Sequence, residues 1–207
     1  MFYITALTIA GSDCSGGAGI QADIKTMSAL GVYASSVITA ITVQNTKGVS
    51  GVYPVDSAVI TEQINAVMDD IRPAAVKIGM LDSRETVSAV ADALCDYRDK
   101  YIVVDPVMIS SSGTRLMRQD AVDTFCSKLL PITYLLTPNI LEAEQLSGIE
   151  INRMEDARTA ACRIAKTGCR NVLVTGGHIE GDTKNDWLFM FDGEKILGEY
   201  LFSDVTV

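Results

Sequence analysis

The sequence predicts an α/β fold with a doubly wound, mainly parallel sheet and helices on both faces. Two patterns support this prediction. Short apolar segments typical of buried strands alternate along the chain with segments whose apolar residues recur at helical spacing. In addition, the first predicted strand, residues 4–10, runs directly into a glycine-rich loop, and a helical pattern through Ile20, Ile24, Met27 and Leu30 follows at once. A strand, a glycine loop and a helix amino terminus in this order are typical of a ligand site.

The next elements continue the alternation of strands and helices. Residues 44–55 interrupt it with the loop-rich, β-prone stretch T-K-G-V-S-G-V-Y-P-V, which we expect to form a small flap over the site. Asp56 is the predicted N-cap of a helix whose apolar face comprises Val59, Ile60, Ile64, Val67 and Met68. Asp82 and Glu85 are spaced as a capping box for the helix after it. In order, we predict a strand at 32–40, the flap at 44–55, a helix at 56–71, a strand at 75–78, a helix at 83–98 and a strand at 101–104.

The second half of the chain carries clear helix and turn signals. Pro131 is expected to close one helix, Asn139 to cap the next, with Gly148 beyond its end, and Gly168 to stop the one after that. The pair Asp192-Gly193 indicates a hairpin turn. In order, we predict a helix at 119–130, a strand at 133–136, a helix at 139–147, a helix at 153–167, a strand at 171–174 and hairpin strands at 187–191 and 195–202.

Composition indicates one domain covering residues 1–207, since this length suffices for a single α/β core. The formal net charge is −9 and no basic run occurs, which argues against nucleic acid and anionic membrane surfaces as partners. No apolar run reaches membrane-spanning length, and the first residues lack the features of a signal peptide. Five cysteines at no metal-like spacing indicate reduced thiols, and we expect a cytoplasmic protein.

The glycine loop does not match a known phosphate-binding motif. It lacks the lysine and hydroxyl pair that ends a P-loop, and its glycine spacing differs from the dinucleotide-binding fingerprint. Asp13 and Asp23 flank the loop, and two carboxylates suit a neutral or cationic ligand with donor groups better than a phosphate. The alternative is that these glycines only make a tight turn.

Residues that follow the predicted strands are expected to meet at one edge of the sheet, because ligands bind at the carboxyl ends of strands in open α/β sheets. Most of these strand ends carry polar or charged side chains. The sets are Gly11-Ser12-Asp13, Gln44-Asn45, Gly79-Met80, Asp105-Pro106-Val107-Met108, Thr137-Pro138-Asn139 and Thr175-Gly176-Gly177-His178.

The same segments resemble a known enzyme family. A-G-S-D-C-S-G-G-A-G-I-Q-A-D, V-I-T-A-I-T-V-Q-N-T, K-I-G-M-L, V-V-D-P-V-M, L-T-P-N-I-L-E-A and G-G-H are similar to the hydroxymethylpyrimidine/phosphomethylpyrimidine kinases of thiamine biosynthesis, which are ribokinase-like. The resemblance runs from residue 4 to the end. It implies that 4-amino-5-hydroxymethyl-2-methylpyrimidine and then its monophosphate are phosphorylated by ATP with Mg²⁺. It also implies a homodimer, with the early strands or the flap near the contact.

The resemblance further implies which residues bind the pyrimidine. They are Gly11, Asp23, Gln44, Met80 and Val107. Gln44 matches the residue that reads the aminopyrimidine edge, and its amide offers the donor and the acceptor that this edge requires. Asp23 matches an acceptor for the amine or the hydroxymethyl group, but a carboxylate in the first turn of a helix is also favoured by the helix dipole. Met80 and Val107 match apolar walls, or they serve core packing alone.

A second group matches the family's nucleotide and metal site: Asp105, Asn139, Thr175 and Gly177 near ATP, with Asp105 and, through water, Glu142 near Mg²⁺. Asn139 and Glu142 are spaced to share one helix face, although Asn139 also suits an N-cap. Many family members carry lysine where this chain has Thr175, whose hydroxyl can bond a phosphate but brings no positive charge.

The family continues beyond the position of Val207 with a Gly-Thr-Gly motif followed by cysteine or aspartate, which supplies the catalytic base and an anion cradle. The resemblance therefore implies a sheet fold whose carboxyl-terminal part is missing here, and we expect no useful kinase turnover from residues 1–207 alone. Two alternatives stay open: a pyridoxal-type vitamin kinase on the same fold, and a non-catalytic pyrimidine-binding module.

Overall fold

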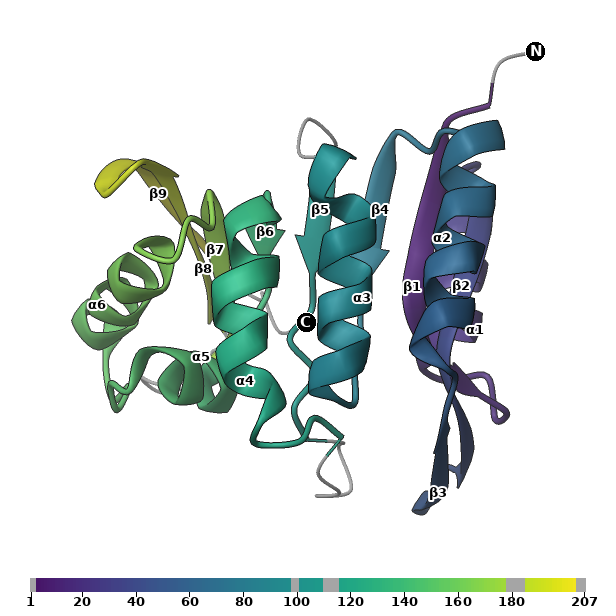
Figure 1. The fold of residues 1–207 in the computed structure, drawn as a ribbon. Coiled ribbons are helices and arrows are strands. Elements are labelled where there is room, and N and C mark those ends of the chain that lie inside the picture. Colours follow the sequence, from purple (N-terminus) through teal and green to yellow (C-terminus); the bar gives the residue numbers. More distant parts are fainter. Residues whose placement is uncertain (1–2, 98–100, 110–115, 178–184, 204–207) are drawn as a thin grey trace.

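The computed structural model describes residues 3–97, 101–109, 116–177 and 185–203, and its strands form one sheet (Figure 1). The strands are β1 (Thr5–Asp13), β2 (Tyr33–Asn45), β3 (Gly48–Pro54), β4 (Ala75–Ile78), β5 (Tyr101–Val104), β6 (Leu135–Leu136), β7 (Asn171–Gly177), β8 (Asn185–Asp192) and β9 (Lys195–Ser203). Their spatial order is β3-β2-β1-β4-β5-β6-β7-β8-β9. The six neighbouring strands β2, β1, β4, β5, β6 and β7 pair in parallel, whereas β3, β8 and β9 are antiparallel to their neighbours. The predicted α/β class with a mainly parallel sheet is confirmed.

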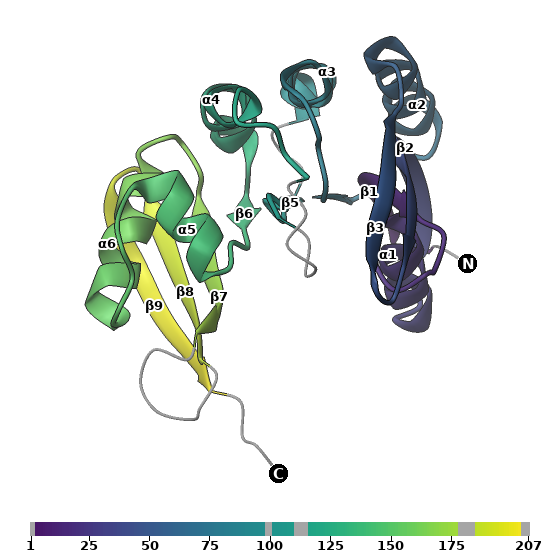
Figure 2. The ribbon, with the colours of Figure 1, turned by 90° about the horizontal axis from the view of Figure 1, so that it is seen from below.

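Helices cover both faces of this sheet (Figure 2). They are α1 (Gly19–Ala29), α2 (Ser57–Asp70), α3 (Arg84–Leu94), α4 (Ala121–Thr124), α5 (Ile140–Ser147) and α6 (Met154–Ala165). The view along the strands shows α1 on one face and α2, α3 and α4 on the other. Helices α5 and α6 pack together and against β7, at the other end of the sheet from α1. No helix in the described ranges is long and apolar enough to span a membrane.

The main core lies between the central strands and the α2–α3 layer. Strands β1, β4 and β5 each contribute fully buried aliphatic residues, as expected for strands inside a parallel sheet. Facing them are buried side chains of α2 and α3, which recur at three- and four-residue spacing. The residues on the two sides are Leu7, Ile9, Val76, Ile78, Ile102, Val104, Ile60, Ile64, Val87, Val90 and Leu94. Of the predicted apolar face of α2, Val59 is the exception, since it is 45% exposed.

The first two strands extend further than the sequence predicts. Strand β1 does not stop at residue 10 but continues through Gly11 to Asp13, because Ser12 and Asp13 pair with β2 after a register shift. Strand β2 runs to Asn45 instead of ending at residue 40. It then pairs with β3 in an antiparallel hairpin, so the predicted flap at 44–55 is built from regular strands.

Two predicted helix boundaries are wrong in detail. The capping box expected from Asp82 and Glu85 does not form. Ser83 is the N-cap of α3, and its Oγ accepts a hydrogen bond from the N–H of Thr86, while Asp82 Oδ1 accepts from the Thr86 hydroxyl. The helix predicted at 119–130 is a single α-turn, α4, followed by a π-turn at Phe125–Leu129 and a 3₁₀ turn at Leu130–Ile132, which contains Pro131.

Other boundary predictions are confirmed. Asn139 caps α5 through a full capping box with Glu142, and Gly148 ends that helix at φ +66°. Asp56 caps α2, accepting from the N–H of Ala58 at 2.8 Å. The turn between β8 and β9 contains Gly193 at φ +59°. Strands β4 and β5 have the predicted limits.

Candidate functional site

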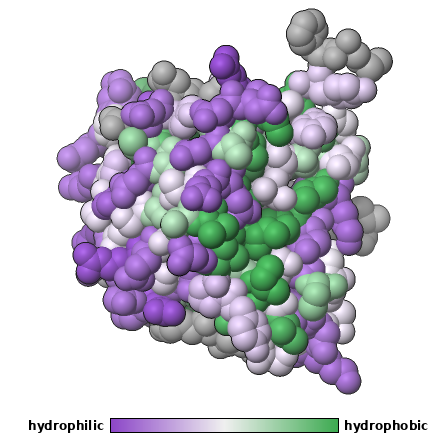
Figure 3. Space-filling model, turned by 45° about the vertical axis from the view of Figure 1, so that its right-hand side comes forward, coloured by the Kyte–Doolittle hydropathy of each residue, from purple (hydrophilic) through white to green (hydrophobic). Residues whose placement is uncertain are grey.

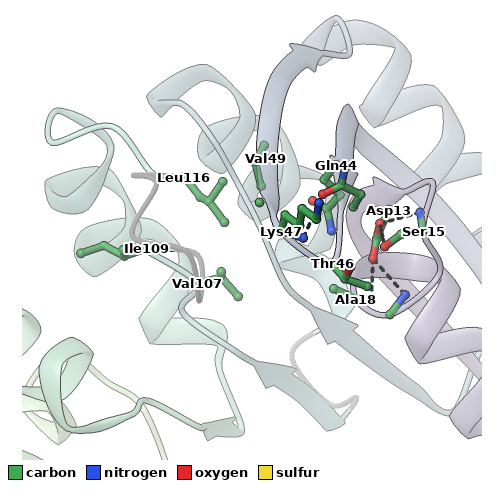
Figure 4. A pocket seen from close by; sticks show the side chains of 13 residues that line it. Asp13, Ser15, Ala18, Gln44, Thr46, Lys47, Val49, Val107, Ile109 and Leu116 are labelled. Carbon is green, nitrogen blue, oxygen red and sulfur yellow. Dashed lines mark hydrogen bonds between the residues drawn. The ribbon is translucent and has the colours of Figure 1, made fainter.

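Two adjoining cavities open at the carboxyl ends of β1, β2, β4 and β5. The inner cavity, of about 260 Å³, lies between the first turns of α1 and the ends of β1 and β4. The outer cavity, of about 530 Å³, lies between the glycine loop, the β2–β3 turn and the segment after β5. Figure 4 shows the outer cavity, with Asp13, Ser15 and Gln44 on one side and Val107, Ile109 and Leu116 across from them. Asp13, Ala18, Gln44, Val107 and Leu116 line both cavities.

The inner cavity brings together all five residues that the sequence assigns to the pyrimidine. Gly11, Asp23, Gln44, Met80 and Val107 line it, together with Asp105. These residues come from two strands, one helix and the segments that follow β4 and β5, so only the parallel topology places them side by side. A methyl group at position 11 would lie 3.3 Å from Met80 Sδ, so glycine at this position leaves space that a side chain would take from the cavity.

Asp13 holds the glycine loop in shape. Its carboxylate accepts hydrogen bonds from the N–H and Oγ of Ser15 at 2.8 and 2.7 Å and from the N–H groups of Gly17 and Ala18 at 2.9 and 2.8 Å. The residue is 3% exposed. The amide groups before α1 that could bind an anion are therefore directed at Asp13. This explains why the loop has glycines but is a poor phosphate cradle.

Burial alone raises the pKa of the Asp13 carboxyl, but the hydrogen bonds from Ser15, Ala18 and the side chain of Gln44 outweigh it and bring the pKa from 3.8 to about 2. We expect this carboxylate to stabilise the folded chain at pH values above 3.8 and to lose that contribution as the pH falls towards about 2. Unfolding by urea at a series of acidic pH values tests this. The difference in unfolding free energy between the wild type and Asp13→Asn should shrink on acidification.

A matched control removes a carboxylate that has no such role. Asp69→Asn changes an exposed residue of α2 and should leave the acid-dependent loss of stability in place. A difference between wild type and Asp13→Asn that stays constant down to the lowest pH would contradict the role given to Asp13.

Gln44 lies at the end of β2, directly after a register irregularity in the β2–β3 pairing. Its Oε1 accepts from the Thr42 hydroxyl at 3.0 Å, and its side chain helps to lower the pKa of the Asp13 carboxyl. An amide oxygen has two lone pairs and an amide nitrogen two hydrogens, so the amide keeps both an acceptor and a donor position for a ligand.

Asp23 has two partners within the protein that the sequence does not predict. Its Oδ2 accepts from the buried Thr8 hydroxyl at 2.6 Å and forms an ion pair with Lys77 Nζ at 3.0 Å. Sequence reasoning missed Lys77, although a lysine within a short apolar strand, V-K-I, is an unusual feature that could have indicated it. Lys77 also lines the inner cavity.

Of the second predicted group, the residues predicted to bind ATP and Mg²⁺, only one is found in the lining of these cavities as far as the structure describes it. Asp105 lines the inner cavity, whereas Asn139, Glu142 and Thr175 are not among the described residues that line either cavity. Asn139 and Thr175 form a parallel bridge beyond the end of β6, and Glu142, in the first turn of α5, accepts from the N–H of Asn139 at 2.9 Å. Gly177 is the last residue of β7, and His178, which follows it, lies outside the described residues.

Both carboxyl groups of this second group have a raised pKa. For Asp105 the main cause is burial, and the ammonium of Lys77 lowers the pKa while the carboxylate of Asp23 raises it. For Glu142 the main cause is again burial. The N–H groups of Asn139 and Met108 lower the Glu142 pKa through hydrogen bonds at 2.9 and 3.4 Å, and the charge of Asp105 raises it. A buried and a half-buried carboxyl group that repel one another favour a cation near them.

Comparison with known proteins gives a consistent result. The family described as "Phosphomethylpyrimidine kinase" matches residues 13–201. The chain is 50% identical over 185 residues to the thiamine biosynthesis bifunctional protein ThiED of Geobacter sulfurreducens, covering 89% of this chain and 38% of that protein. It is 50% identical over 194 residues to the hydroxymethylpyrimidine/phosphomethylpyrimidine kinase of Rhizobium meliloti, covering 93% of this chain and 71% of that protein.

Solved structures share the fold. The phosphomethylpyrimidine kinase of Clostridium difficile 630 superposes with a TM-score of 0.87 at 47% identity, covering 96% of this chain and 84% of that one. An ADP complex of Bacillus subtilis pyridoxal kinase gives a TM-score of 0.83 at 33% identity, covering 98% of this chain and 75% of that one. Pyrimidine kinases and pyridoxal kinases, the two kinase activities that the sequence leaves open, are thus both found among the ribokinase-like relatives of this fold.

Proposed function

The chain belongs to the phosphomethylpyrimidine kinase family, and from this premise we propose that it binds 4-amino-5-hydroxymethyl-2-methylpyrimidine in the inner cavity and phosphorylates it, and then its monophosphate, with ATP. The observation that carries the proposal is the convergence of Gly11, Asp23, Gln44, Met80 and Val107 on one cavity. The chain spans 38% of ThiED and 71% of the Rhizobium kinase, so the proposal concerns the kinase unit that these residues share.

Gln44 would recognise the ring. Thr42 engages one lone pair of Oε1, so the amide can accept from the 4-amino group through the other and donate a hydrogen of its nitrogen to the adjacent ring nitrogen. Met80 and Val107 supply apolar surface for the faces of the ring. Asp23, held by Thr8 and Lys77, would accept from the hydroxymethyl group and orient it.

Asp105 and Glu142 would hold Mg²⁺ through water. In the described part of the chain no group of three or more acidic, cysteine or histidine side chains is placed to ligate a metal. Both oxygens of Glu142 already accept hydrogen bonds from backbone N–H groups. These residues therefore fit a hydrated Mg²⁺, which contacts few carboxylates directly. When bound, the ion would neutralise phosphate charge during transfer.

Asn139, Thr175 and Gly177 would lie against ATP at the ends of β6 and β7. The ADP and AMP-PCP complexes among the pyridoxal kinases support a nucleotide site in this fold. Thr175 donates its backbone N–H to Pro138 O at 2.8 Å, and its hydroxyl makes a long hydrogen bond of 3.5 Å to the same oxygen. The hydroxyl would exchange this weak bond for one to a phosphate oxygen. In this proposal Mg²⁺ and not residue 175 supplies the positive charge at that position.

The proposal extends to the assembly. We place residues 1–207 in one domain, with 44–55 as a flap at the outer cavity, and we assign a homodimer. Figure 3 shows a hydrophobic area on the side of the molecule where α2 and the β2–β3 hairpin lie. Exposed apolar side chains on these elements are Ile41, Val43, Tyr53 and Val59. Contiguous exposed apolar surface is typical of an interface. The five cysteines, all within the described residues, form no disulfide, which supports a reducing compartment such as the cytoplasm.

A phosphorylation assay tests the function. The natural protein that contains this sequence, incubated with ATP, Mg²⁺ and the hydroxymethylpyrimidine, should yield the monophosphate and then the diphosphate, which mass spectrometry distinguishes. Omission of Mg²⁺ should remove the activity. Transfer to pyridoxal with no transfer to the pyrimidine would contradict the proposal.

The second candidate is a pyridoxal kinase. It is favoured by the pyridoxal kinase neighbours, whose fold agrees with a TM-score of 0.83 but whose identity to this chain is 33%, against 50% for the Rhizobium pyrimidine kinase. A non-catalytic pyrimidine-binding module is a further alternative. It would bind the pyrimidine in the assay above and form no product.

A further inference from the structure

Lys77 places one positive charge in a cavity that is otherwise acidic. The described residues that line the inner cavity include three carboxylates, Asp13, Asp23 and Asp105, and Lys77 is the only cation among them. Asp13 is already engaged by four hydrogen bonds within the glycine loop. The charges that a ligand meets on the β4 side of the cavity are therefore those of Asp23, Asp105 and Lys77.

The ammonium of Lys77 is held by an ion pair and still has donor hydrogens for a ligand. It forms a 3.0 Å ion pair with Asp23 Oδ2, and an ammonium has three donor hydrogens. The side chain is 26% exposed, and its surface faces the cavity that it lines. The neighbouring Gly79 also matters, because a methyl group there would lie 3.0 Å from Lys77 Nζ. Glycine at position 79 thus leaves room beside the ammonium.

The two acceptors named for the related kinases differ greatly in charge. The alcohol is neutral, whereas its phosphate monoester carries close to two negative charges near neutral pH. Asp23 and Asp105 would repel such an anion. A fixed cation next to these carboxylates that can donate to the phosphate oxygens would offset this repulsion.

We propose, building on the pyrimidine kinase function above, that Lys77 is the specificity-determining residue that admits the phosphorylated pyrimidine to the inner cavity. Lys77 holds Asp23 in place when the neutral alcohol is bound. It donates its remaining hydrogens to the phosphate when the monoester is bound. No group is transferred in this step, so the role is one of binding alone.

Calorimetric titration with the hydroxymethylpyrimidine and with its monophosphate tests the proposal. The variant is Lys77→Gln, which keeps a hydrogen-bond donor for Asp23 but removes the charge. We expect the ratio of the dissociation constants, monophosphate over alcohol, to rise by about tenfold or more, since hydrogen bonds to charged groups are the stronger ones. Lys77→Arg should restore most of the wild-type ratio. If Lys77→Gln does not fold, Lys77→Met provides the same ratio.

Two lysines serve as controls. Lys25→Met removes a cation that bonds Gly16 O in the glycine loop but lines neither cavity, and it should leave the ratio unchanged. Lys47→Met removes the lysine of the outer cavity. A selective loss of the monophosphate in Lys47→Met with none in Lys77→Gln would overturn the proposal. So would equal losses of both ligands in Lys77→Gln, since these indicate a purely structural role. If the wild type binds the alcohol and either of these variant results is found, only the role of Lys77 is refuted. If the wild type binds neither pyrimidine, the proposed function is refuted as well.

Discussion

Gly19→Ala is expected to abolish pyrimidine binding and to destabilise the chain. Gly19 begins α1 at φ +56°, a conformation that costs other residues about 1–2 kcal/mol. In addition, a methyl group at position 19 would collide with the backbone oxygen of Gly11. Backbone cannot move aside as a flexible side chain can, so the first turn of α1 or the end of β1 must shift. Gly11 lines the inner cavity, and a shift there changes its shape.

Gly31→Ala is the matched control for this variant. Gly31 has a similar φ of +74°, but a methyl group there would meet nothing within 4 Å. It should lose stability by about 1 kcal/mol through backbone strain alone and should keep its affinity for the pyrimidine. Unfolding by urea and calorimetry of both variants separate strain from collision. Equal affinities of Gly19→Ala and Gly31→Ala for the pyrimidine would contradict the role of the Gly11–Gly19 contact.

Gln44→Ala is expected to weaken binding of the hydroxymethylpyrimidine by about tenfold or more, because polar groups of the ligand left without partners cost about 1–3 kcal/mol. The free energy of unfolding should change less than the binding free energy, since Gln44 lies at the end of β2 and is only partly buried. Calorimetry provides the affinity. Gln63→Ala is a suitable control, because Gln63 also bonds β2, at Ile38 N, but lines neither cavity. Unchanged affinity in Gln44→Ala would refute the assignment of the amide.

Much of the fold follows from local signals along the chain. Asn139 and Gly148 mark the ends of α5 because a capping side chain and a left-handed residue act within one turn. The extension of β1 through Gly11 could not be predicted in this way, since it depends on pairing with β2, far along the sequence. The same holds for the cap of α3: Asp82 and Ser83 are both good caps, and tertiary packing selects Ser83.

In the candidate site, too, some residues can be predicted from the sequence and others depend on tertiary contacts. The strand-end rule, together with the family resemblance, brings Gly11, Gln44, Met80, Val107 and Asp105 to one cavity. The partners that orient the site are not visible in the sequence. Thr8 and Lys77 lie inside strands, where a polar side chain has no local signal that tells which helix residue it meets. Their contact with Asp23 exists only once α1 packs on the sheet.

The most direct test of the account is a competition titration of this chain with the hydroxymethylpyrimidine and pyridoxal. We predict that the pyrimidine binds one molecule per chain, that pyridoxal displaces it only at a large excess, and that Gln44→Ala reduces the affinity for the pyrimidine. Tighter binding of pyridoxal, or binding of the pyrimidine that is unaffected by Gln44→Ala, would contradict the central claim that the inner cavity is a pyrimidine site read by Gln44.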